Sequence, residues 1–330
     1  MANETIQTIA RRAGVSIATV SKVLNGTGKI SSKTSARILE IIKESNYIPQ
    51  QRKQTGNAIA VLTFVYNNVS FANSFDANVL GGICKAAFQR NLDITLVNGE
   101  KVIQMSVPEL HRYFLTNSLS GAILVSQTAS EEFEKRLADS ALPFVSIGSR
   151  LGPCSIETDT RSAIRSILDY MVCLGHKKIA YLGLITRKVE AHRKRFAAFS
   201  EFMKENNLDI PEEYIIELPN SQDATIRNAL MRLTARRCPP DAIFFESEAL
   251  AETVNILKEL GINVPQDISV AGFYCKRPDT ENSCSAIIQP ADHLGECAVE
   301  TLCKITETPL TQKHELLPCQ IVYGNTIRKI

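Results

Sequence analysis

The chain has 330 residues and a formal net charge of +2, from 37 Lys or Arg and 35 Asp or Glu. That length predicts more than one domain, because a single hydrophobic core rarely grows beyond about 250–300 residues. The sequence contains no apolar run of about 18 residues and no signal-peptide pattern at its start, so it predicts neither a membrane span nor export and favours a cytoplasmic protein.

The start of the chain predicts two short amphipathic helices joined at one glycine. Apolar residues from Ile6 to Ala13 follow the i, i+3, i+4, i+7 spacing of one helix face, and a second apolar stripe runs from Val15 to Leu24. Between them Gly14 can adopt a positive φ and end the first helix, while Ser16 can cap the second. Such a short turn is typical of a helix-turn-helix, whose second helix enters the DNA major groove, although an ordinary helical hairpin is the alternative.

A third helix and a local surplus of positive charge follow this hairpin. Ser31 is the expected cap, apolar residues 38, 39, 41 and 42 form the buried stripe, and the helix is expected to end near Asn46. Residues 1–58 carry nine Lys or Arg against three Glu, whereas residues 59–330 carry 28 basic and 32 acidic side chains. The basic segment is therefore the one expected to meet DNA phosphates.

From residue 59 onward, apolar strand-like runs alternate with helical stretches. We expect strands at IAVLTF, DITLV, GAILVS and PFVSIG, and again at KIAYLG, YIIEL, AIFF and ISVAGF. The expected helices lie near 76–90, 106–117, 130–140, 190–207, 223–236 and 248–260. This alternation predicts two doubly wound parallel sheets of the α/β class.

Several motifs in this order resemble the lactose-repressor family of bacterial transcription regulators. They are TIARRAGVSIATVSKVLNGTGKISSKTSARILEIIKESNYIP at the start, LGHKKIAYLG at 174–183, RFAAF from 195, GINVPQDISVAGF at 261–273 and IIQP at 287–290. The resemblance implies an all-α headpiece at 1–49, a linker at 50–58 and a two-lobed core at 59–330 that is similar to periplasmic binding proteins. Lobe one is expected at about 59–158 and 290–317, and lobe two at about 159–289 and 318–330.

The resemblance also implies two sets of site residues. The DNA-contacting set is Thr5, Ser16, Ile17, Ala18, Thr19, Ser21, Lys22, Asn25, Lys29 and Arg52. The effector-contacting set, in a cleft between the lobes, is Asn73, Phe75, Gly148, Arg195, Ser247, Tyr274 and Gln289. Two alternatives stay open here: Phe75 is equally compatible with a core position, and a position on an exposed helix surface is the lesser alternative for Arg195.

Departures from the family pattern bear on the effector. Ser247-Glu248, Tyr274-Cys275 and Gly148-Ser149 stand where the family commonly has Asn-Asp, Asp-Asp and an Asp. A site that loses such carboxylates changes its ligand. Among sugars, phosphorylated sugars and sugar acids, we therefore favour a phosphorylated or acidic effector held by Arg195, with Arg150 or Arg161 near it; a nucleoside is an alternative.

The linker QQRKQTGNA is short and contains no leucine, whereas many family members insert a leucine of a small linker helix into the DNA minor groove. We therefore expect no such helix, with Arg52 and Lys53 either contacting DNA or forming a plain tether. The nine scattered cysteines and five histidines show no metal-binding spacing, and no catalytic motif is present, so we expect no cofactor, metal or enzymatic activity. The prediction is a homodimeric repressor that binds pseudo-palindromic operator DNA and a small-molecule effector, with a solute-binding receptor as the alternative.

Overall fold

The computed structural model describes residues 5–24, 30–44, 57–63, 74–125, 131–140, 142–149, 152–184, 190–274, 284–307 and 312–330. Contacts within the chain divide it into two compact units. The first comprises Met1–Ser70, Leu80–Ile156 and Gly295–His314, and the second comprises Phe71–Val79, Glu157–Leu294 and Glu315–Ile330. The lobe boundaries derived from the sequence remain a prediction. Among the described helices, none combines the length and apolar character needed to cross a bilayer.

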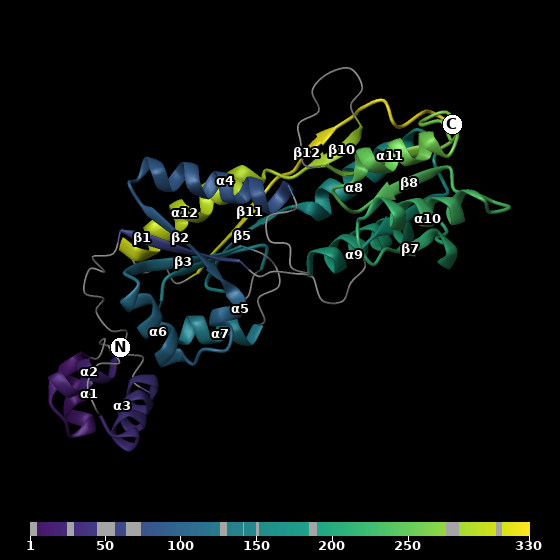
Figure 1. Ribbon diagram of the computed structural model, residues 1–330. Coiled ribbons are helices and arrows are strands. Elements are labelled where there is room, and N and C mark those ends of the chain that lie inside the picture. The colour runs from purple at the N-terminus through teal and green to yellow at the C-terminus, as the bar shows by residue number, and fades with distance from the viewer. Residues whose placement is uncertain are drawn as a thin grey trace. The chain divides into compact units, whose positions relative to one another are not determined.

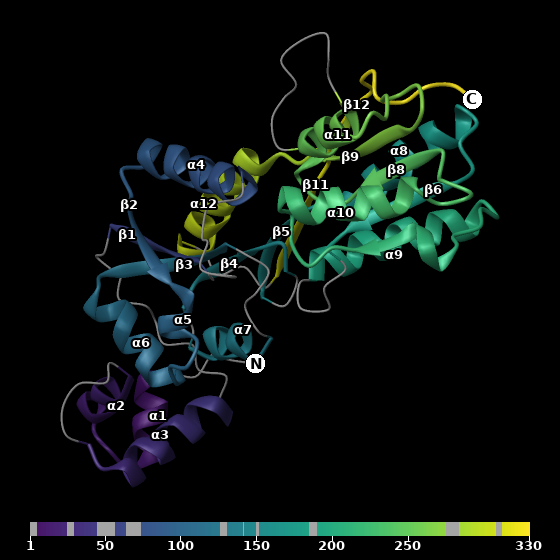
Figure 2. The same ribbon diagram turned by 45° about the vertical axis from the view of Figure 1, so that its right-hand side comes forward.

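Three short helices form the headpiece: α1 (Ile6–Ala13), α2 (Ile17–Leu24) and α3 (Ser32–Glu44) (Figure 2). Their apolar stripes meet in one small core. Its fully buried members are Ile9, Ala10, Ala13, Val20, Ile38 and Ile41. The predicted spacing of apolar residues therefore accounts for how the three helices pack.

The first unit contains a six-stranded sheet in the order β11-β5-β4-β3-β1-β2. Its strands are β1 (Ala58–Thr63), β2 (Asp93–Asn98), β3 (Leu119–Val125), β4 (Phe144–Ile147), β5 (Cys154–Thr158) and β11 (Lys313–Leu317). Its helices are α4 (Ser74–Gln89), α5 (Gly99–Val102), α6 (Val107–Thr116), α7 (Glu131–Asp139) and α12 (Ala291–Glu307). The pairs β1–β2, β1–β3, β3–β4 and β4–β5 are parallel, and helices connect β1, β2, β3 and β4 in sequence.

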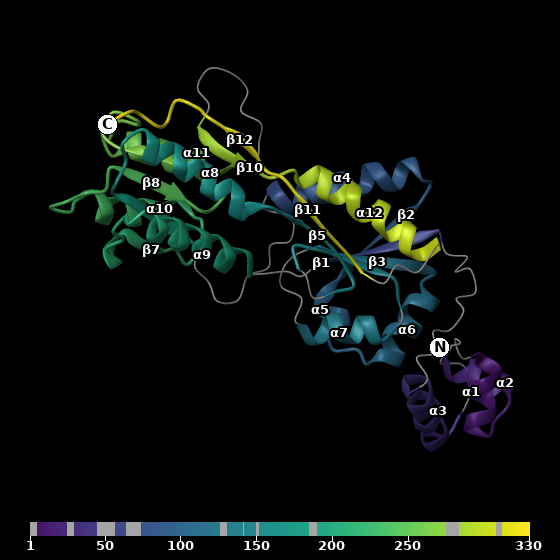
Figure 3. The same ribbon diagram turned by 180° about the vertical axis from the view of Figure 1, so that it is seen from behind.

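Helices cover both faces of this sheet. Figures 1 and 3 show α4 and α12 side by side on one face, where Lys85 of α4 lies 2.6 Å from Glu296 of α12. On the other face α6 and α7 bury Phe114 and Phe133 against β1, β3 and β4. Parallel sheets need this double cover, which explains why the interior strand β1 is apolar on both sides.

The second unit contains another six-stranded sheet, in the order β12-β10-β9-β8-β6-β7. Its strands are β6 (Ile179–Gly183), β7 (Ile215–Glu217), β8 (Ala242–Phe245), β9 (Ser269–Tyr274), β10 (Ser285–Ile288) and β12 (Gln320–Val322). Its helices are α8 (Thr160–Cys173), α9 (Glu190–Glu205), α10 (Asp223–Thr234) and α11 (Leu250–Glu259), with a 3-10 turn at Glu212–Tyr214. Only the pairing of β12 with β10 is antiparallel among the strand pairs described for this sheet.

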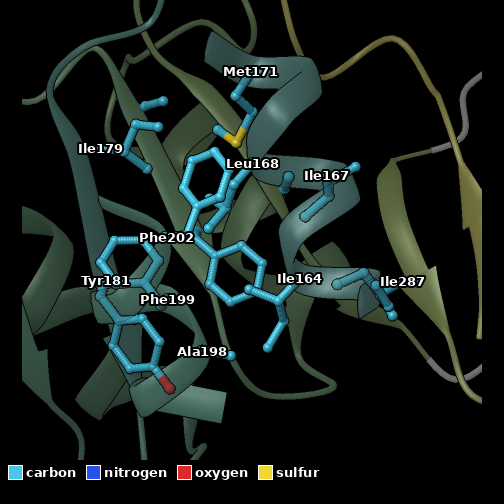
Figure 4. Packing of buried hydrophobic residues seen from close by; sticks show 14 of the residues in the cluster. Ile164, Ile167, Leu168, Met171, Ile179, Tyr181, Ala198, Phe199, Phe202 and Ile287 are labelled. Carbon is cyan, nitrogen blue, oxygen red and sulfur yellow. The ribbon is translucent and has the colours of Figure 1, made fainter. Parts of the chain in front are cut away.

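Side chains alternate between the two faces of this second sheet. Tyr181 and Phe273 point to the face covered by α8 and α9, where Phe199 and Phe202 complete an aromatic core (Figure 4). The intervening residues point to the face covered by α10 and α11, and Tyr274 packs on that side. Adjacent residues at the end of β9 thus lie on opposite faces of the sheet.

Candidate functional site

The turn between α1 and α2 depends on one glycine. Gly14 has φ +64° and ψ 34°, and its N–H donates to the carbonyl oxygens of Ala10 and Arg11. This left-handed conformation is inexpensive for glycine and costs other residues roughly 1–2 kcal/mol. The chain therefore reverses within three residues and brings α2 against α1.

Each headpiece helix begins with the same capping arrangement. A Ser or Thr accepts from the backbone N–H three residues later, and its hydroxyl also contacts a Thr hydroxyl at that position. The pairs are Thr5 with Thr8, Ser16 with Thr19, and Ser31 with Thr34, with hydroxyl oxygens 3.1, 2.8 and 2.7 Å apart. Thr5 and Ser16, both predicted to contact DNA, therefore also serve as helix caps.

The outer face of α2 is available to a partner. Ser16, Ala18 and Lys22 are exposed, and Ile17 keeps 46% of its surface accessible, whereas Val20 is fully buried on the inner face. Thr19 and Ser21 are half-buried. The predicted contacts Asn25, Lys29 and Arg52 lie outside the described residues. The α2 face thus presents a cation, hydroxyls and apolar groups together, the side-chain types that contact base edges and thymine methyls.

A second polar site lies where strands of the second sheet end. Glu246 directly follows β8, and Gln289 directly follows β10. Arg195 of α9 lies between them: its Nη1 donates to Glu246 Oε1 at 2.8 Å, and its Nη2 donates to Gln289 Oε1 at 2.8 Å. The carboxyl ends of parallel strands are where ligands bind in such sheets.

Further contacts extend this site into a network. Arg195 Nη1 also donates to the Glu246 backbone oxygen at 3.1 Å, and the guanidinium lies 4.0 Å from the centroid of the Phe273 ring. Gln289 Nε2 donates to Thr158 Oγ1 at 2.7 Å. His192, one turn before Arg195 on α9, places its Nδ1 2.7 Å from Glu246 Oε1. The network holds Arg195 in one orientation.

Glu246 is fully buried and ionised. Burial raises its pKa, but the charge of Arg195 and the hydrogen bond from His192 outweigh burial, and the pKa lies below its usual value. The same carboxylate contributes to a raised pKa at Tyr181, where burial is the larger cause. Glu246 also accepts from the Leu184 N–H at 3.1 Å. An ionised carboxylate here requires Arg195, because unpaired buried charge is strongly unfavourable.

A glycine makes room for this carboxylate. A Cβ on Gly183 would lie 2.5 Å from the Glu246 Cβ and 2.9 Å from Tyr181 Cε1. Such distances do not occur between real side chains, so the close approach of β6 and Glu246 excludes any larger residue at position 183.

The other predicted effector contacts that the structure describes have different neighbours. The Ser247 hydroxyl lies 2.8 Å from that of Ser221, and Tyr274 packs on the opposite face of the sheet from Arg195. Gly148, with φ 83°, donates its N–H to Ile156 in the first unit, and Phe75 is half-buried on α4. Asn73 lies outside the described residues. Of the predicted effector set, the structure joins Arg195 and Gln289 directly.

Sequence reasoning missed Glu246 and His192. Glu246 had a detectable signal, since it is a charged residue directly after the four buried residues of β8. Arg161, predicted near the effector, is paired with Glu201 at 2.8 Å, and Arg150 lies outside the described residues. Among the described residues, no group of three or more His, Cys, Asp or Glu side chains is arranged to hold a metal ion.

Two family models match the chain. Residues 5–50 match the model of bacterial regulatory proteins of the lacI family, and residues 168–327 match a periplasmic binding protein-like domain. Catabolite control protein A of Priestia megaterium is 28% identical over 312 residues, covering 92% of each chain. The HTH-type transcriptional repressor PurR of Vibrio vulnificus is 26% identical over 341 residues, covering 99% of each chain.

Solved structures of regulators share this fold over nearly the whole length of the chain. The lac repressor dimer bound to operator and the anti-inducer ONPF has a TM-score of 0.66 at 23% identity, covering 99% of this chain and 100% of that one. The complex of the regulator CelR with cellobiose has a TM-score of 0.69 at 21% identity, covering 98% of this chain and 100% of that one.

A helix-turn-helix headpiece joined to two doubly wound α/β sheets defines a DNA-binding transcription regulator with a periplasmic binding protein-like core. Residues 5–50 form a helix-turn-helix domain of the lacI family of bacterial regulatory proteins, and residues 168–327 form a periplasmic binding protein-like domain. The fold class, the family and the regulatory function predicted from the sequence are therefore confirmed, and the relatives named here are regulators rather than enzymes.

Proposed function

We propose that the protein is a homodimeric, cytoplasmic repressor whose α2 helices bind a pseudo-palindromic operator and whose affinity for DNA is set by a small-molecule effector. The effector binds at the carboxyl end of the second sheet, beside Arg195 and Gln289. Two headpieces in a two-fold dimer match two half-sites about 10 base pairs or a multiple apart.

The observation that carries the DNA-binding part is the exposed outer face of a capped α2 helix. Ile17, Ala18 and Lys22 are exposed on it, while Val20 fixes its inner face in the headpiece core. The segment around it, residues 1–58, has six more basic than acidic side chains. This combination supports base contacts by α2 and phosphate contacts by its surroundings.

A charge-matched pair of variants tests this proposal. An operator is first selected from random DNA with the full-length wild type, and its affinity is then measured for Lys22→Ala and Lys33→Ala, which remove the same charge from exposed positions on α2 and α3. We expect Lys22→Ala to weaken operator binding by about 1–3 kcal/mol, roughly 5–150-fold, and random-sequence binding much less.

Lys33→Ala is expected to weaken both DNAs similarly, through charge alone. If Lys22→Ala also weakens operator and random DNA equally, the assignment of α2 as the base-contacting helix is wrong.

The effector part of the proposal is supported by the buried polar network at the ends of β8 and β10. A neighbour of the same fold was solved with cellobiose, and another with the anti-inducer ONPF. A solute-binding receptor would share the core but would have no use for the α2 face. Thermal-shift screening of sugars, sugar phosphates, sugar acids and nucleosides tests for an effector, since a ligand at 100 times its dissociation constant stabilises by about 2.7 kcal/mol.

A further inference from the structure

The histidine of the LGHKK motif lies near the amino ends of the strands of the second sheet, away from the carboxyl ends that carry the Arg195 network. His176 follows the turn after α8 and has no exposed surface. Its Nδ1 lies 3.1 Å from Oδ1 of Asp241, the residue directly before β8, and its Nε2 lies 3.0 Å from the Arg328 carbonyl oxygen. The DNA-binding face and the effector site use none of these groups.

Both partners of the His176 ring can only accept hydrogen bonds. A carbonyl oxygen has no proton to give, and Asp241 is ionised. Burial raises the pKa of Asp241, but hydrogen bonds from the His176 ring and from the backbone N–H groups of Lys177 and Lys178 outweigh it, and the pKa lies below its usual value. The two N–H groups reach Oδ2 at 3.2 and 3.0 Å. Each ring nitrogen therefore faces an oxygen that requires a donor.

A neutral imidazole cannot satisfy both oxygens, because it has one N–H and one lone pair. With the proton on Nδ1, the lone pair of Nε2 would face the Arg328 carbonyl oxygen at 3.0 Å, and with the proton on Nε2, that of Nδ1 would face Asp241 at 3.1 Å. Either arrangement leaves two buried acceptors opposed and unsatisfied, which is costly. The imidazolium form donates to both, and ionised Asp241 supplies the counter-charge that a buried cation needs.

The Arg328 carbonyl belongs to the segment 326–330, which docks along the second sheet. Thr326 exchanges hydrogen bonds of 2.7 and 2.8 Å with the backbone of β9. At the other end of the segment, Ile330 donates its N–H to the Leu174 carbonyl oxygen at 2.8 Å. Between these two anchors the carbonyl oxygen of Arg328 meets the histidine ring. The ring therefore joins the turn after α8, the start of β8 and the segment 326–330.

Other charges on the segments around the ring are exposed. Among the described residues, Asp241 is the charged side chain in hydrogen-bond contact with the ring. The exposed charges on the neighbouring segments are Lys177, Lys178, Asp267, Arg328 and Lys329. Four of these five are cations and oppose a proton on the ring, but solvent and salt screen exposed charges strongly. The close, half-buried carboxylate of Asp241 therefore dominates.

We propose that His176 is a buried imidazolium whose Nε2 proton latches the segment 326–330 to the second sheet, so that losing this proton at alkaline pH loosens the segment. In an unfolded chain a histidine becomes neutral above about pH 6.5. The stabilisation from the latch is therefore fully present below about pH 6.5, and it is lost as pH rises through the range where the folded protein releases the proton. This property belongs to the second unit alone and does not rest on the effector site.

The first experiment determines the protonation of the ring directly. Nitrogen-15 spectra of the full-length protein labelled at histidine show which ring nitrogens carry protons. At about pH 7.5, where an unfolded histidine is roughly nine-tenths neutral, we expect both nitrogens of His176 to be protonated. His176→Gln assigns the signal, and if that variant does not fold, replacing the other four histidines one at a time assigns it by elimination. A bare nitrogen on His176 at pH 7.5 overturns the proposal.

The second experiment measures how stability depends on pH. Urea unfolding of the full-length wild type, His176→Gln and Asp241→Asn is followed from pH 6 to pH 9, with His293→Gln as the control that removes an exposed histidine on α12. Where only the folded wild type keeps the proton, its folding constant relative to His176→Gln or Asp241→Asn is expected to fall tenfold per pH unit. The ratio to His293→Gln is expected to lack this fall. A ratio to His176→Gln that does not change with pH overturns the proposal.

A third measurement tests whether the proton holds the segment. Methyl spectra of the wild type labelled at isoleucine report on Ile327, which is 8% exposed, and on Ile330, with Ile243 of β8 as a buried reference. We expect the Ile330 signal to move towards its unfolded position over the same pH range in which the His176 ring loses its proton, while Ile243 stays in place. An Ile330 signal that does not follow the ring shows that the proton is not a latch and overturns the proposal.

Discussion

Replacing Arg195 with methionine isolates the energetic role of the buried pair. The substitution keeps a long apolar stem but removes the guanidinium, leaving Glu246 fully buried with only the Leu184 N–H and the His192 ring as donors. Removing one partner of a buried ion pair costs about 3–5 kcal/mol. For a folding unit of roughly 150–250 residues this corresponds to a fall in thermal midpoint of about 6–20 °C.

The double variant Arg195→Met/Glu246→Leu is the matched control. It replaces both charges by apolar groups and leaves no unpaired ion, so most of the lost stability is expected to return. Calorimetry of the wild type, Arg195→Met, Glu246→Leu and the double variant completes a double-mutant cycle. If the two single costs simply add in the double variant, Arg195 and Glu246 are not energetically coupled and the interpretation of the network is refuted.

The pH dependence provides a second readout with a defined sign. In the wild type the pKa of Glu246 is lowered, because Arg195 and His192 outweigh burial. The pair's contribution is therefore fully present above the unfolded pKa of about 4.3 and is lost as pH falls through the lower folded value. In Arg195→Met burial dominates and raises the pKa, so the folded state binds the extra proton and the deficit of the variant shrinks as pH falls from 7 towards 5.

Three further predictions concern DNA binding. Operator affinity is expected to fall by about 10³–10⁵ between 50 and 200 mM salt, because each headpiece displaces counterions from several phosphates, and a flat salt response measured by fluorescence anisotropy would contradict this. Ser16→Ala and Ser31→Ala each remove a helix cap worth about 0.5–2 kcal/mol of stability. At a temperature where both variants are folded, only Ser16→Ala is expected to weaken operator binding. Equal losses of operator affinity in the two variants would mean that Ser16 contributes to stability alone. Linker residues 50–58 lie largely outside the described residues, and the prediction that they form no minor-groove helix stays a prediction. It implies that inserting one or two base pairs between the half-sites changes operator affinity little. An abrupt loss of affinity with each insertion would show that the headpieces are held rigidly.

The headpiece was predictable almost residue by residue because its signals are local. The Gly14 turn and the caps Ser16 and Ser31 each act within one helical turn, and the structure places all three as expected. The alternating strands and helices of both sheets were predictable for the same reason, since a period of two or 3.6 residues is visible in any short window.

Elements defined by distant partners were not predicted. β11 pairs with β5, although Leu317 and Asp159 are far apart in the sequence, and the mixed polar sequence KHELL gives only a weak strand signal. The strands β5, β10 and β12 were also absent from the predicted elements. The helices α8 and α12 were absent too, although their 3.6-residue spacing of apolar residues is a local signal. Strand pairing between remote segments depends on the finished topology, which local periodicity does not encode.

The candidate effector site also contains residues that the sequence singles out and residues whose role depends on distant partners. The sequence singles out Arg195 as an effector contact, which stays a prediction, but it does not single out the partner Glu246, because the ion pair forms only when α9 packs at the end of β8. The side of the sheet on which Tyr274 lies could have been predicted from the sequence. Phe273 and Tyr274 are adjacent in β9, so their side chains leave the sheet on opposite faces, and the Phe273 ring lies against the Arg195 guanidinium.

The position of β11 has a consequence for how the protein is made. β11 completes the first sheet beside β5, where Ser155 Oγ and His314 Nδ1 lie 2.8 Å apart, yet the ribosome synthesises nearly all of the second sheet between these two strands. At about 5–20 residues per second, roughly 10–30 s pass between the emergence of β5 and that of its neighbour. Throughout this interval β5 is an uncovered strand edge, able to pair with another nascent chain. Crowded polysomes are therefore where this fold is most exposed to misassembly, and slowing translation between residues 158 and 313 would lengthen that exposure.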